Sequence, residues 1–179
     1  MNTIEYLTQL EELSQHYVKE LDSFTLEQLQ AQPSEQEWSL GQMYMHLIQT
    51  ALRMQIRNIE LCSSQDIAPG QQAGEKSEAG QAVFSSGAFP PIRIQVPPSP
   101  EYTPQQPESK EQIIQGLHAV QEKMRAIEPT LDAIDPQRTA AHPRLGALQA
   151  KEWFALVVMH YRHHLQQKDR LKAFLTAGV

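Results

Sequence analysis

Two histidines four residues apart carry the clearest chemical signal in the sequence. His160 and His164 lie one helical turn apart, so on a helix their imidazoles leave the same face and can reach one ion. Burying two such side chains on an otherwise apolar stripe would be costly without a partner. The spacing therefore predicts two of the ligands of a divalent-metal site. Tyr161 stands where a zincin would carry its glutamate, which excludes that type of metalloprotease.

A third ligand is needed, because catalytic zinc centres commonly use three protein ligands and leave a position open. His46 meets this need, since it lies next to Leu47 on the inner face of an earlier helical stretch. Spacing alone leaves the ion open among zinc, nickel, manganese and iron, because imidazole binds several of them. Gln167, one turn beyond His164, is a candidate to contact a ligand or the substrate, and a hydrogen bond to backbone fits equally well. No catalytic acid or base can be identified.

The other four histidines and the single cysteine are expected to stay outside this set. His163 should point outward, and His142 should fix the turn before the last helix. His16 and His118 lack partners at ligand spacing and are expected to face solvent. Cys62 lies several turns beyond His46 with no visible base, which predicts an inert thiol.

Four segments with helical periodicity must position these residues. We expect helices over residues 4–24, 40 to about 62, 109 to about 131 and 149 to about 177, with a short helical turn at 25–29. Ser39 and Ser109 are each followed three residues later by glutamine, which is a capping-box pattern. Trp38 and Trp153 stand at two helix starts and are expected to pack in the core, with a ligand-stacking wall as the alternative. The predicted fold class is all-α, a four-helix bundle.

The connection between the second and third helices is unusually long. Residues 63–108 lack a helical pattern, and seven prolines crowd between residues 90 and 107. We expect the first half to be mobile and the second to lie extended along the helices. The apolar residues expected to hold that second half in place are Phe89, Ile92, Ile94 and Val96. A crossover of this length lets the second and third helices run parallel, which gives an up-down-down-up bundle.

Composition limits the class of protein. The chain has 179 residues, a net charge of −6 and one cysteine. The acidic balance disfavours a nucleic-acid binder, and one cysteine excludes an internal disulfide framework. No apolar run reaches the length of a membrane span, and no basic leader begins the sequence. We therefore expect one cytoplasmic domain over residues 1–179, with neither nucleic acid nor membrane as a partner.

Three sequence blocks and their order resemble the DinB/YfiT-like superfamily, a family of damage-inducible helical bundles. The blocks are WSLGQMYMHLIQT, HPRLGALQAKEW and HYRHHLQQKDRL, and the proline-rich FPPIRIQVPPSPEYTPQQPESKEQII between the first two is also similar. The resemblance implies the same bundle topology, a homodimer, and a divalent metal, often zinc or nickel, held by His46, His160 and His164. Gln149 departs from the serine or threonine usual before the last helix, so a looser helix start is expected.

The resemblance also frames the function. Its members include hydrolase-like proteins and enzymes that conjugate low-molecular-weight thiols to electrophiles. The first hypothesis is a metal-dependent thiol S-transferase that uses a bacillithiol-like thiol and a small electrophilic substrate. A metal-dependent hydrolase of amide or ester bonds is the alternative, and a non-catalytic metal-binding or ligand-binding bundle is the third possibility.

Overall fold

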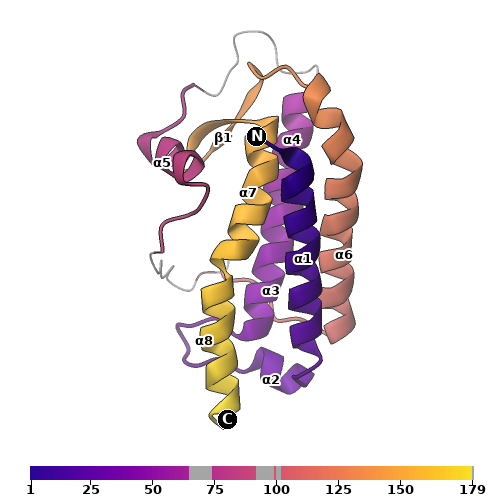
Figure 1. Cartoon of the computed structure of the whole chain (residues 1–179). Helices are drawn as coiled ribbons and strands as arrows, with labels where there is room; N and C mark the ends of the chain where they lie inside the picture. The colour runs from indigo at the N-terminus through magenta and orange to yellow at the C-terminus, as the bar shows by residue number, and fades with distance from the viewer. Residues whose placement is uncertain (65–73, 92–98, 100–101, 179) are drawn as a thin grey trace.

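The computed structural model describes residues 1–64, 74–91, 99 and 102–178. Four long helical segments form the body of the molecule (Figure 1). They are α1 (Thr3–Leu21), the run of α3 (Leu40–Thr50), η1 (Ala51–Gln55) and α4 (Ile56–Ser63), then α6 (Lys110–Ile127), and finally the pair α7 (Ala150–His163) and α8 (Leu165–Thr176). Among the described residues, no helix is long and apolar enough to cross a membrane.

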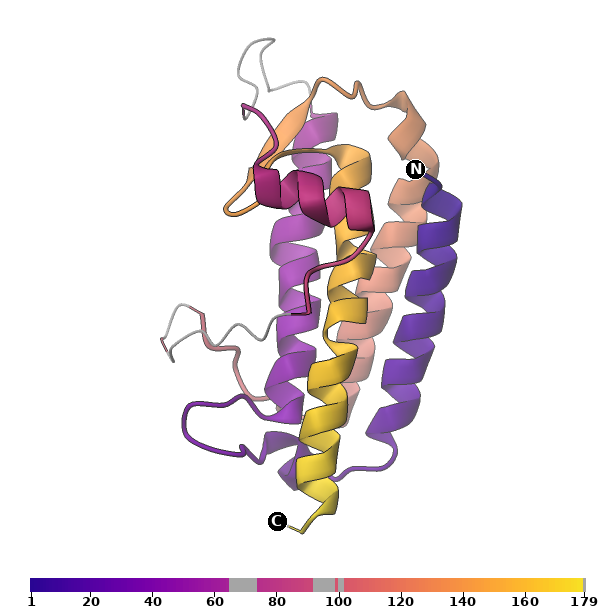
Figure 2. The same ribbon diagram turned by 60° about the vertical axis from the view of Figure 1, so that its left-hand side comes forward.

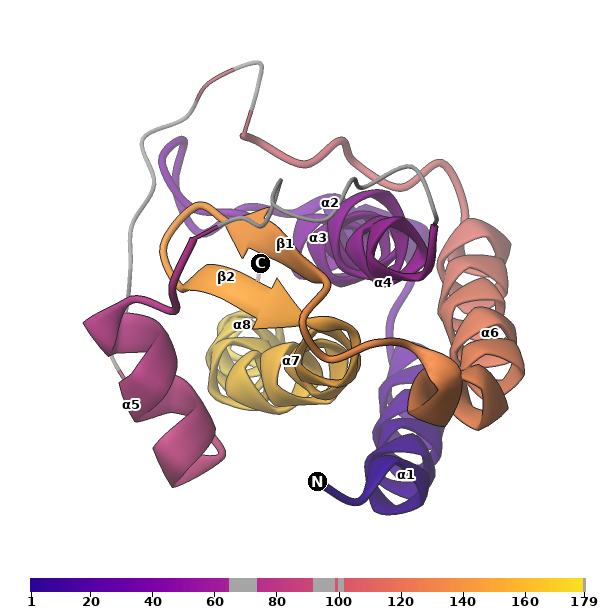
Figure 3. The same cartoon turned by 90° about the horizontal axis from the view of Figure 1, so that it is seen from above.

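The helices follow the predicted up-down-down-up order. Seen from above, α1, α6, α4 and α7 stand at the corners of the bundle, with α1 and α4 on one diagonal (Figure 3). The second and third helical segments run in the same direction, as does the fourth with the first (Figure 1). This arrangement requires a crossover along the length of the bundle between α4 and α6, and the all-α prediction with this topology is confirmed.

Local capping explains where the helices begin. The Ser39 hydroxyl accepts the backbone N–H of Gln42, while the Gln42 side chain accepts the N–H of Ser39. Ser109 caps α6 by accepting from the N–H of Gln112, whereas the Gln112 side chain accepts the N–H of Glu108, so this pair does not close a capping box. A second capping box at Thr25 starts the short α2 (Leu26–Gln30). Each box satisfies two backbone donors that the first helical turn would leave without partners.

The third helix ends just before its proline. α6 stops at Ile127 and is followed by the 3-10 helix η2 (Glu128–Ala133), with Pro129 near its start. Proline cannot supply the N–H that an α-helix interior needs. The α-helix therefore ends a few residues before the predicted limit of about residue 131, and a tighter turn carries the buried Leu131 back to the core.

Two helices that the sequence predicts as continuous contain interruptions. The second carries a π-helical turn at Ala51–Gln55, and the fourth breaks at His164, whose ψ of −4° leaves the regular helical value. Both interruptions lie near a predicted metal ligand, since His46 precedes the π turn by five residues and His164 is itself the break. π turns of this kind are frequent at functional sites.

The expectation that residues 63–108 contain no helix is wrong. Helix α5 (Glu78–Ser86) lies across the outside of the bundle (Figure 2). Ser77 caps its first turn, and Gly87 ends it in the left-handed region with φ 69°. The adjoining residues 65–73, which belong to the half predicted to be mobile, lie outside the described part of the chain.

A β-hairpin also replaces part of the turn predicted before the last helix. Strands β1 (Thr139–His142) and β2 (Gly146–Gln149) pair antiparallel, and a bridge from Lys76 to Gly146 joins the hairpin to the start of α5. A Cβ at Gly146 would stand 2.5 Å from the backbone of Glu75 and of Ser77, and φ there is 75°. Only glycine fits this close approach.

The proline-rich half of the connection packs on the helices where it is described. Pro104 and Pro107 are buried, and their carbonyls accept hydrogen bonds from the side chains of Gln42 and Gln30 at 2.8 Å. Phe89 is half-buried against the core, as predicted. The other predicted anchors, Ile92, Ile94 and Val96, lie outside the described residues.

Candidate metal centre

The structure brings the three predicted ligand residues together at mid-height of the bundle. His46 comes from α3, His160 from α7, and His164 from the junction of α7 and α8. The Nε2 atom of His160 lies 3.0 Å from that of His46 and 3.0 Å from that of His164. Their ring centroids are 4.6 to 5.0 Å apart. Three imidazole nitrogens thus converge on one point.

Neighbouring side chains fix two of these rings from behind. The Nδ1 of His164 is 2.7 Å from the Gln167 amide oxygen, so Nδ1 donates and Nε2 keeps its lone pair for the centre. The Nδ1 of His46 is 3.4 Å from the Thr50 hydroxyl. The Nδ1 of His160 is buried and has no hydrogen-bond partner in the described part of the chain. Gln167 therefore holds a ligand histidine, which is the first of its two predicted roles.

Burial keeps all three imidazoles neutral at physiological pH. Desolvation lowers the pKa of His46 to about 3 and that of His164 to about 4. Desolvation, and after it the electrostatic effect of the neighbouring imidazoles, holds the pKa of His160 well below its usual value. Neutral imidazole is the form that binds a metal ion, so protons do not compete for these nitrogens near pH 7.

This donor set fits a divalent ion. Ligands about 2.0–2.1 Å from an ion are about 2.9 Å apart at a right angle and about 3.4 Å apart at the tetrahedral angle. The observed separations of 3.0 Å fall in this range. Within the described residues, this is the one cluster of three or more His, Cys, Asp or Glu side chains close enough to share an ion. Three protein ligands leave further coordination positions for water or substrate.

Aromatic side chains flank the centre on two sides. The half-buried Trp38 ring lies 4.8 Å from the His46 ring. Phe89, from the segment after α5, lies 6.4 Å from the His160 ring. The structure therefore favours the alternative reading of Trp38, as a wall beside the site. Trp153 is fully buried, its indole N–H reaches the Ala140 carbonyl at 3.3 Å, and it packs in the core as predicted.

One of the remaining histidines differs from expectation, and another has a contact that the sequence did not predict. His163 is half-buried, not turned to solvent, and its ring lies 5.5 Å from Phe89 and 5.4 Å from His164. His16 is exposed, as predicted, and its Nε2 is 2.7 Å from the Nζ of Lys168. Neither contact follows from spacing along a single helix, since each depends on a residue from a distant segment.

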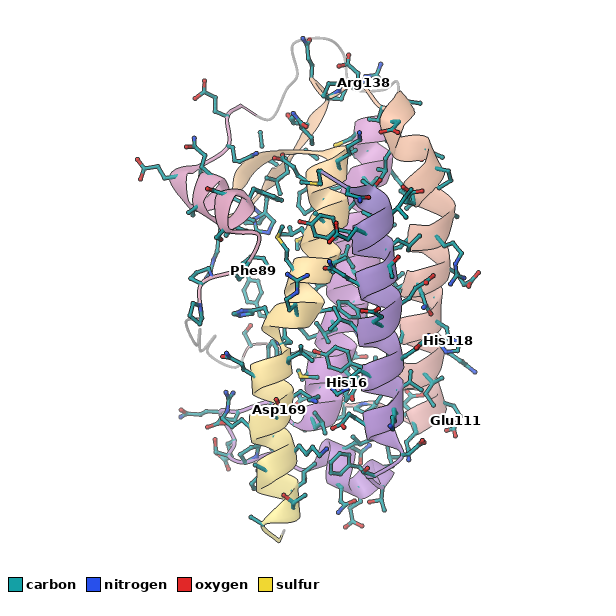
Figure 4. All side chains as sticks on the ribbon, in the orientation of Figure 1. His16, Phe89, Glu111, His118, Arg138 and Asp169 are labelled. Atoms are coloured by element: carbon teal, nitrogen blue, oxygen red, sulfur yellow. The ribbon has the colours of Figure 1, made fainter. Side chains whose placement is uncertain are left out.

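The other predictions for single residues agree with the structure. His142 fixes the turn, its Nδ1 accepting the backbone N–H groups of Arg144 and Leu145 at 3.1 Å. His118 is exposed on the outer side of α6 (Figure 4). Cys62 is buried, and desolvation raises the pKa of its thiol to about 11, which keeps it protonated and unreactive at neutral pH.

The start of the fourth helix is held firmly, contrary to the expectation for Gln149. The Glu152 carboxylate accepts the backbone N–H of Gln149 at 3.0 Å and also forms an ion pair with Lys76, next to α5. Glu152 is largely buried, so this pair ties α5 to the beginning of α7. The acidic residue three positions into the helix thus reaches back to the N-cap N–H, as the glutamate of a capping box does.

Comparison with known proteins agrees with this architecture. The sequence profile of the DinB superfamily matches residues 9–167. The chain belongs to the DinB superfamily. No curated protein matches the sequence. Among solved structures, YfiT from Bacillus subtilis is similar with a TM-score of 0.63 and 17% identity, over 97% of this chain and 87% of YfiT. That protein is described as a probable metal-dependent hydrolase with an unusual four-helix bundle topology. At this identity, the likeness establishes the fold.

Proposed function

We propose that this DinB-superfamily chain is an enzyme that binds one divalent metal ion through His46, His160 and His164. The observation that carries this proposal is the convergence of three neutral imidazoles, with the Nε2 atom of His160 lying 3.0 Å from that of His46 and 3.0 Å from that of His164. Zinc and nickel are the favoured ions, with manganese and iron as alternatives, because borderline ions suit a set of imidazole ligands. Such an ion would lower the pKa of a thiol or a water molecule that binds beside it.

The favoured reaction is transfer of a low-molecular-weight thiol, such as a bacillithiol-like thiol, to a small electrophile. Five described side chains have a ring contact or a hydrogen bond to the three histidines, and none of these five is a carboxylate; they are Trp38, Thr50, Phe89, His163 and Gln167. A thiol held next to a metal is already a thiolate and needs no separate base. Hydrolysis usually relies on a placed general acid or base. The surroundings therefore favour thiol transfer.

In this reaction the thiolate sulfur forms a bond to an electrophilic carbon. A leaving group such as chloride departs with the bonding electron pair, and the thiol proton passes to solvent. The chain's own part is to hold the histidines in place through Gln167 and Thr50, and to keep the flanks of the site apolar through Trp38 and Phe89.

Hydrolysis of an ester or amide is the second candidate. It is supported by the description of YfiT as a probable metal-dependent hydrolase and by the similarity of fold. The same three-histidine site could serve a water molecule in place of a thiol. The difference between the two candidates is therefore the nucleophile, and an assay can separate them.

The test compares zinc-loaded and nickel-loaded protein with and without added thiol. Monochlorobimane with bacillithiol reports thiol transfer, and 4-nitrophenyl acetate without thiol reports hydrolysis. Conjugation above the uncatalysed rate that disappears in His46→Ala and persists in the surface variant His118→Ala supports the transferase. Thiol-independent turnover with the same dependence on His46 supports the hydrolase. No turnover of either probe by metal-loaded protein would contradict the catalytic proposal and favour a binding protein.

A further inference from the structure

A cavity of about 150 Å³ lies beside the metal centre, between the fourth helix and the segment that follows α5. Its lining residues are Ala88, Phe89 and Pro91 from that segment, and Met159, Arg162, His163 and Gln166 from the fourth helical segment. Positions 159, 162, 163 and 166 follow the helical period and share one face. Met159 and His163 are the sequence neighbours of His160 and His164, so this face adjoins the one that carries the ligands.

The cavity and the metal centre share walls. The Phe89 ring faces both regions, at 5.5 Å from the His163 ring and 6.4 Å from the His160 ring. The His163 ring meets the His164 ring edge to face at 5.4 Å. A molecule with its reactive group at the three histidines can therefore place an attached group against Phe89 and His163.

The lining indicates what kind of group fits. Phe89, Met159, Pro91 and Ala88 give apolar walls, while His163, Arg162 and Gln166 add polar atoms. No carboxylate lines the cavity within the described part of the chain. A cavity of about 150 Å³ with apolar walls is large enough for a benzene ring. An alkylammonium group would meet the positive charge of Arg162 without an acidic partner.

Arg162 also fixes the wall of the cavity. Its guanidinium donates to the Gly87 carbonyl at 3.4 Å and to the side-chain oxygen of Gln9 on α1. Gly87 ends α5, and Ala88 and Phe89 follow it directly. The arginine thus connects the fourth helix, α1 and the segment that carries the aromatic wall, which holds the cavity open at a set width.

We propose that this cavity is a substrate subsite that accepts an uncharged, phenyl-sized apolar group attached to the group that reacts at the metal. The inference rests on the proposed function, because it assigns the non-reacting part of that enzyme's substrate. The larger hollow of about 400 Å³, lined by Gln9, Glu12, Leu13, His16, Arg162 and Leu165, lies toward α1. It shares Arg162 with the lining of the smaller cavity, but Phe89 and His163 do not line it.

The first test compares two metal-chelating probes on the zinc-loaded protein. Benzohydroxamate and acetohydroxamate carry the same chelating group, and they differ in a phenyl or a methyl substituent. We expect benzohydroxamate to bind at least about tenfold more tightly by calorimetry, because the ring is buried in the cavity. Ala88→Trp fills the cavity and should remove this preference. Ala82→Trp, at an exposed position of α5 outside the lining, should retain it. Ala88→Leu is the milder variant and should give an intermediate ratio.

The second test does not depend on metal. Fluorobenzene is titrated into metal-free protein labelled with ¹³C at the methionine methyl groups, and the Met159 resonance is identified by its loss in Met159→Leu. A saturable shift of Met159 that is absent in Ala88→Trp supports the subsite. If this shift occurs but neither hydroxamate binds the zinc-loaded protein, the metal proposal fails and the subsite stands. Equal affinity for the two hydroxamates, with no saturable shift of Met159, overturns the subsite and leaves the metal proposal intact.

Discussion

Two histidine-containing clusters lie along the fourth helical segment, and they differ in charge balance. The first is the triad of His46, His160 and His164. The second lies toward α1, where the buried Lys168 contacts His16 at 2.7 Å, Asp169 at 2.9 Å and Glu20 at 3.6 Å. A second lysine, Lys172, also donates to Glu20, at 2.6 Å.

This comparison separates a metal site from a salt-bridge network. In the α1-facing cluster every ammonium has an acceptor, and the hydrogen bond from Lys172 lowers the pKa of Glu20, so the charges balance internally. In the triad, three neutral imidazoles converge, and the side chains that contact their outer nitrogens are the uncharged Thr50 and Gln167. Proximity of histidines alone is therefore a weak indicator of a metal site. A stronger indicator is a set of converging acceptor atoms that no lysine or arginine side chain contacts.

The largest expected effect is the loss of metal from triad variants. Wild-type protein purified with zinc or nickel should contain about one ion per chain. His160→Ala and His46→Ala remove one of three ligands and should weaken binding by more than about 100-fold, beyond the loss typical of outer-sphere changes. Elemental analysis by mass spectrometry measures this directly. His16→Ala, in the other cluster, is the matched control and should retain full metal content. Equal metal content in all three variants would contradict the assignment of the site.

Gln167 should have the next largest effect. Gln167→Leu removes the acceptor that fixes the ring of His164, and we expect metal affinity to fall by roughly 10- to 100-fold. Thr50→Val should cost less, because its contact to His46 is 3.4 Å against 2.7 Å for Gln167. Competition with a chromophoric chelator gives both values. An unchanged metal affinity in Gln167→Leu would show that the hydrogen bond between His164 and Gln167 does not contribute to metal binding.

The α1-facing cluster should affect stability and leave metal binding intact. Glu20→Gln removes a carboxylate next to the buried Lys168 ammonium, so we expect unfolding free energy to fall by about 1–2 kcal/mol. Urea denaturation measures the change, and metal content should stay at the wild-type value. Glu12→Gln, at an exposed position of the same helix, should be close to neutral. A loss of metal in Glu20→Gln would show that the two clusters are coupled.

The smallest expected effect is a loss of folding stability at acidic pH, which should come from the triad and not from the α1-facing cluster. The pKa of His46, about 3, and of His164, about 4, lie below the value of 6.5 in an unfolded chain. Between those values the unfolded state binds more protons, so stability present above pH 6.5 is lost as the pH falls. Glu20 titrates from a value already below 4.5 and adds nothing in this window.

The measurement compares chelator-treated wild type with chelator-treated His46→Gln at pH 7 and pH 5. We expect the wild type to lose about 1 kcal/mol more unfolding free energy than the variant, once the partial exposure of His46 is allowed for. Identical losses in the two proteins would mean that His46 titrates normally in the folded state.

Much of this arrangement can be predicted from the sequence, because local rules place the main elements. Ser39 and Ser109 cap two helix starts, the periodic stripes give the helix faces, and the spacing of His160 and His164 places two predicted ligands one turn apart. The length of the proline-rich connection predicts the parallel second and third helices. Each of these signals is either a pattern of a few adjacent residues or the length of a segment, so it can be read directly from the sequence.

The remaining features depend on contacts between distant segments. Helix α5 is short and lacks a strong apolar stripe, and its position follows from the Lys76–Glu152 ion pair and the close approach of Gly146. Phe89 reaches the metal centre only because the crossover passes beside α7. The buried surroundings of His163 and the partner of His16 likewise come from other helices, so no pattern within one helix could reveal them.

The central claim is that three imidazoles hold one divalent ion. The most direct test is a crystal structure of the zinc-loaded protein with anomalous diffraction measured on both sides of the zinc absorption edge. The account predicts one strong anomalous peak about 2.0–2.1 Å from the Nε2 atoms of His46, His160 and His164. A fully zinc-loaded crystal with its peak elsewhere, or with fewer than three of these histidines bound to it, would contradict the claim.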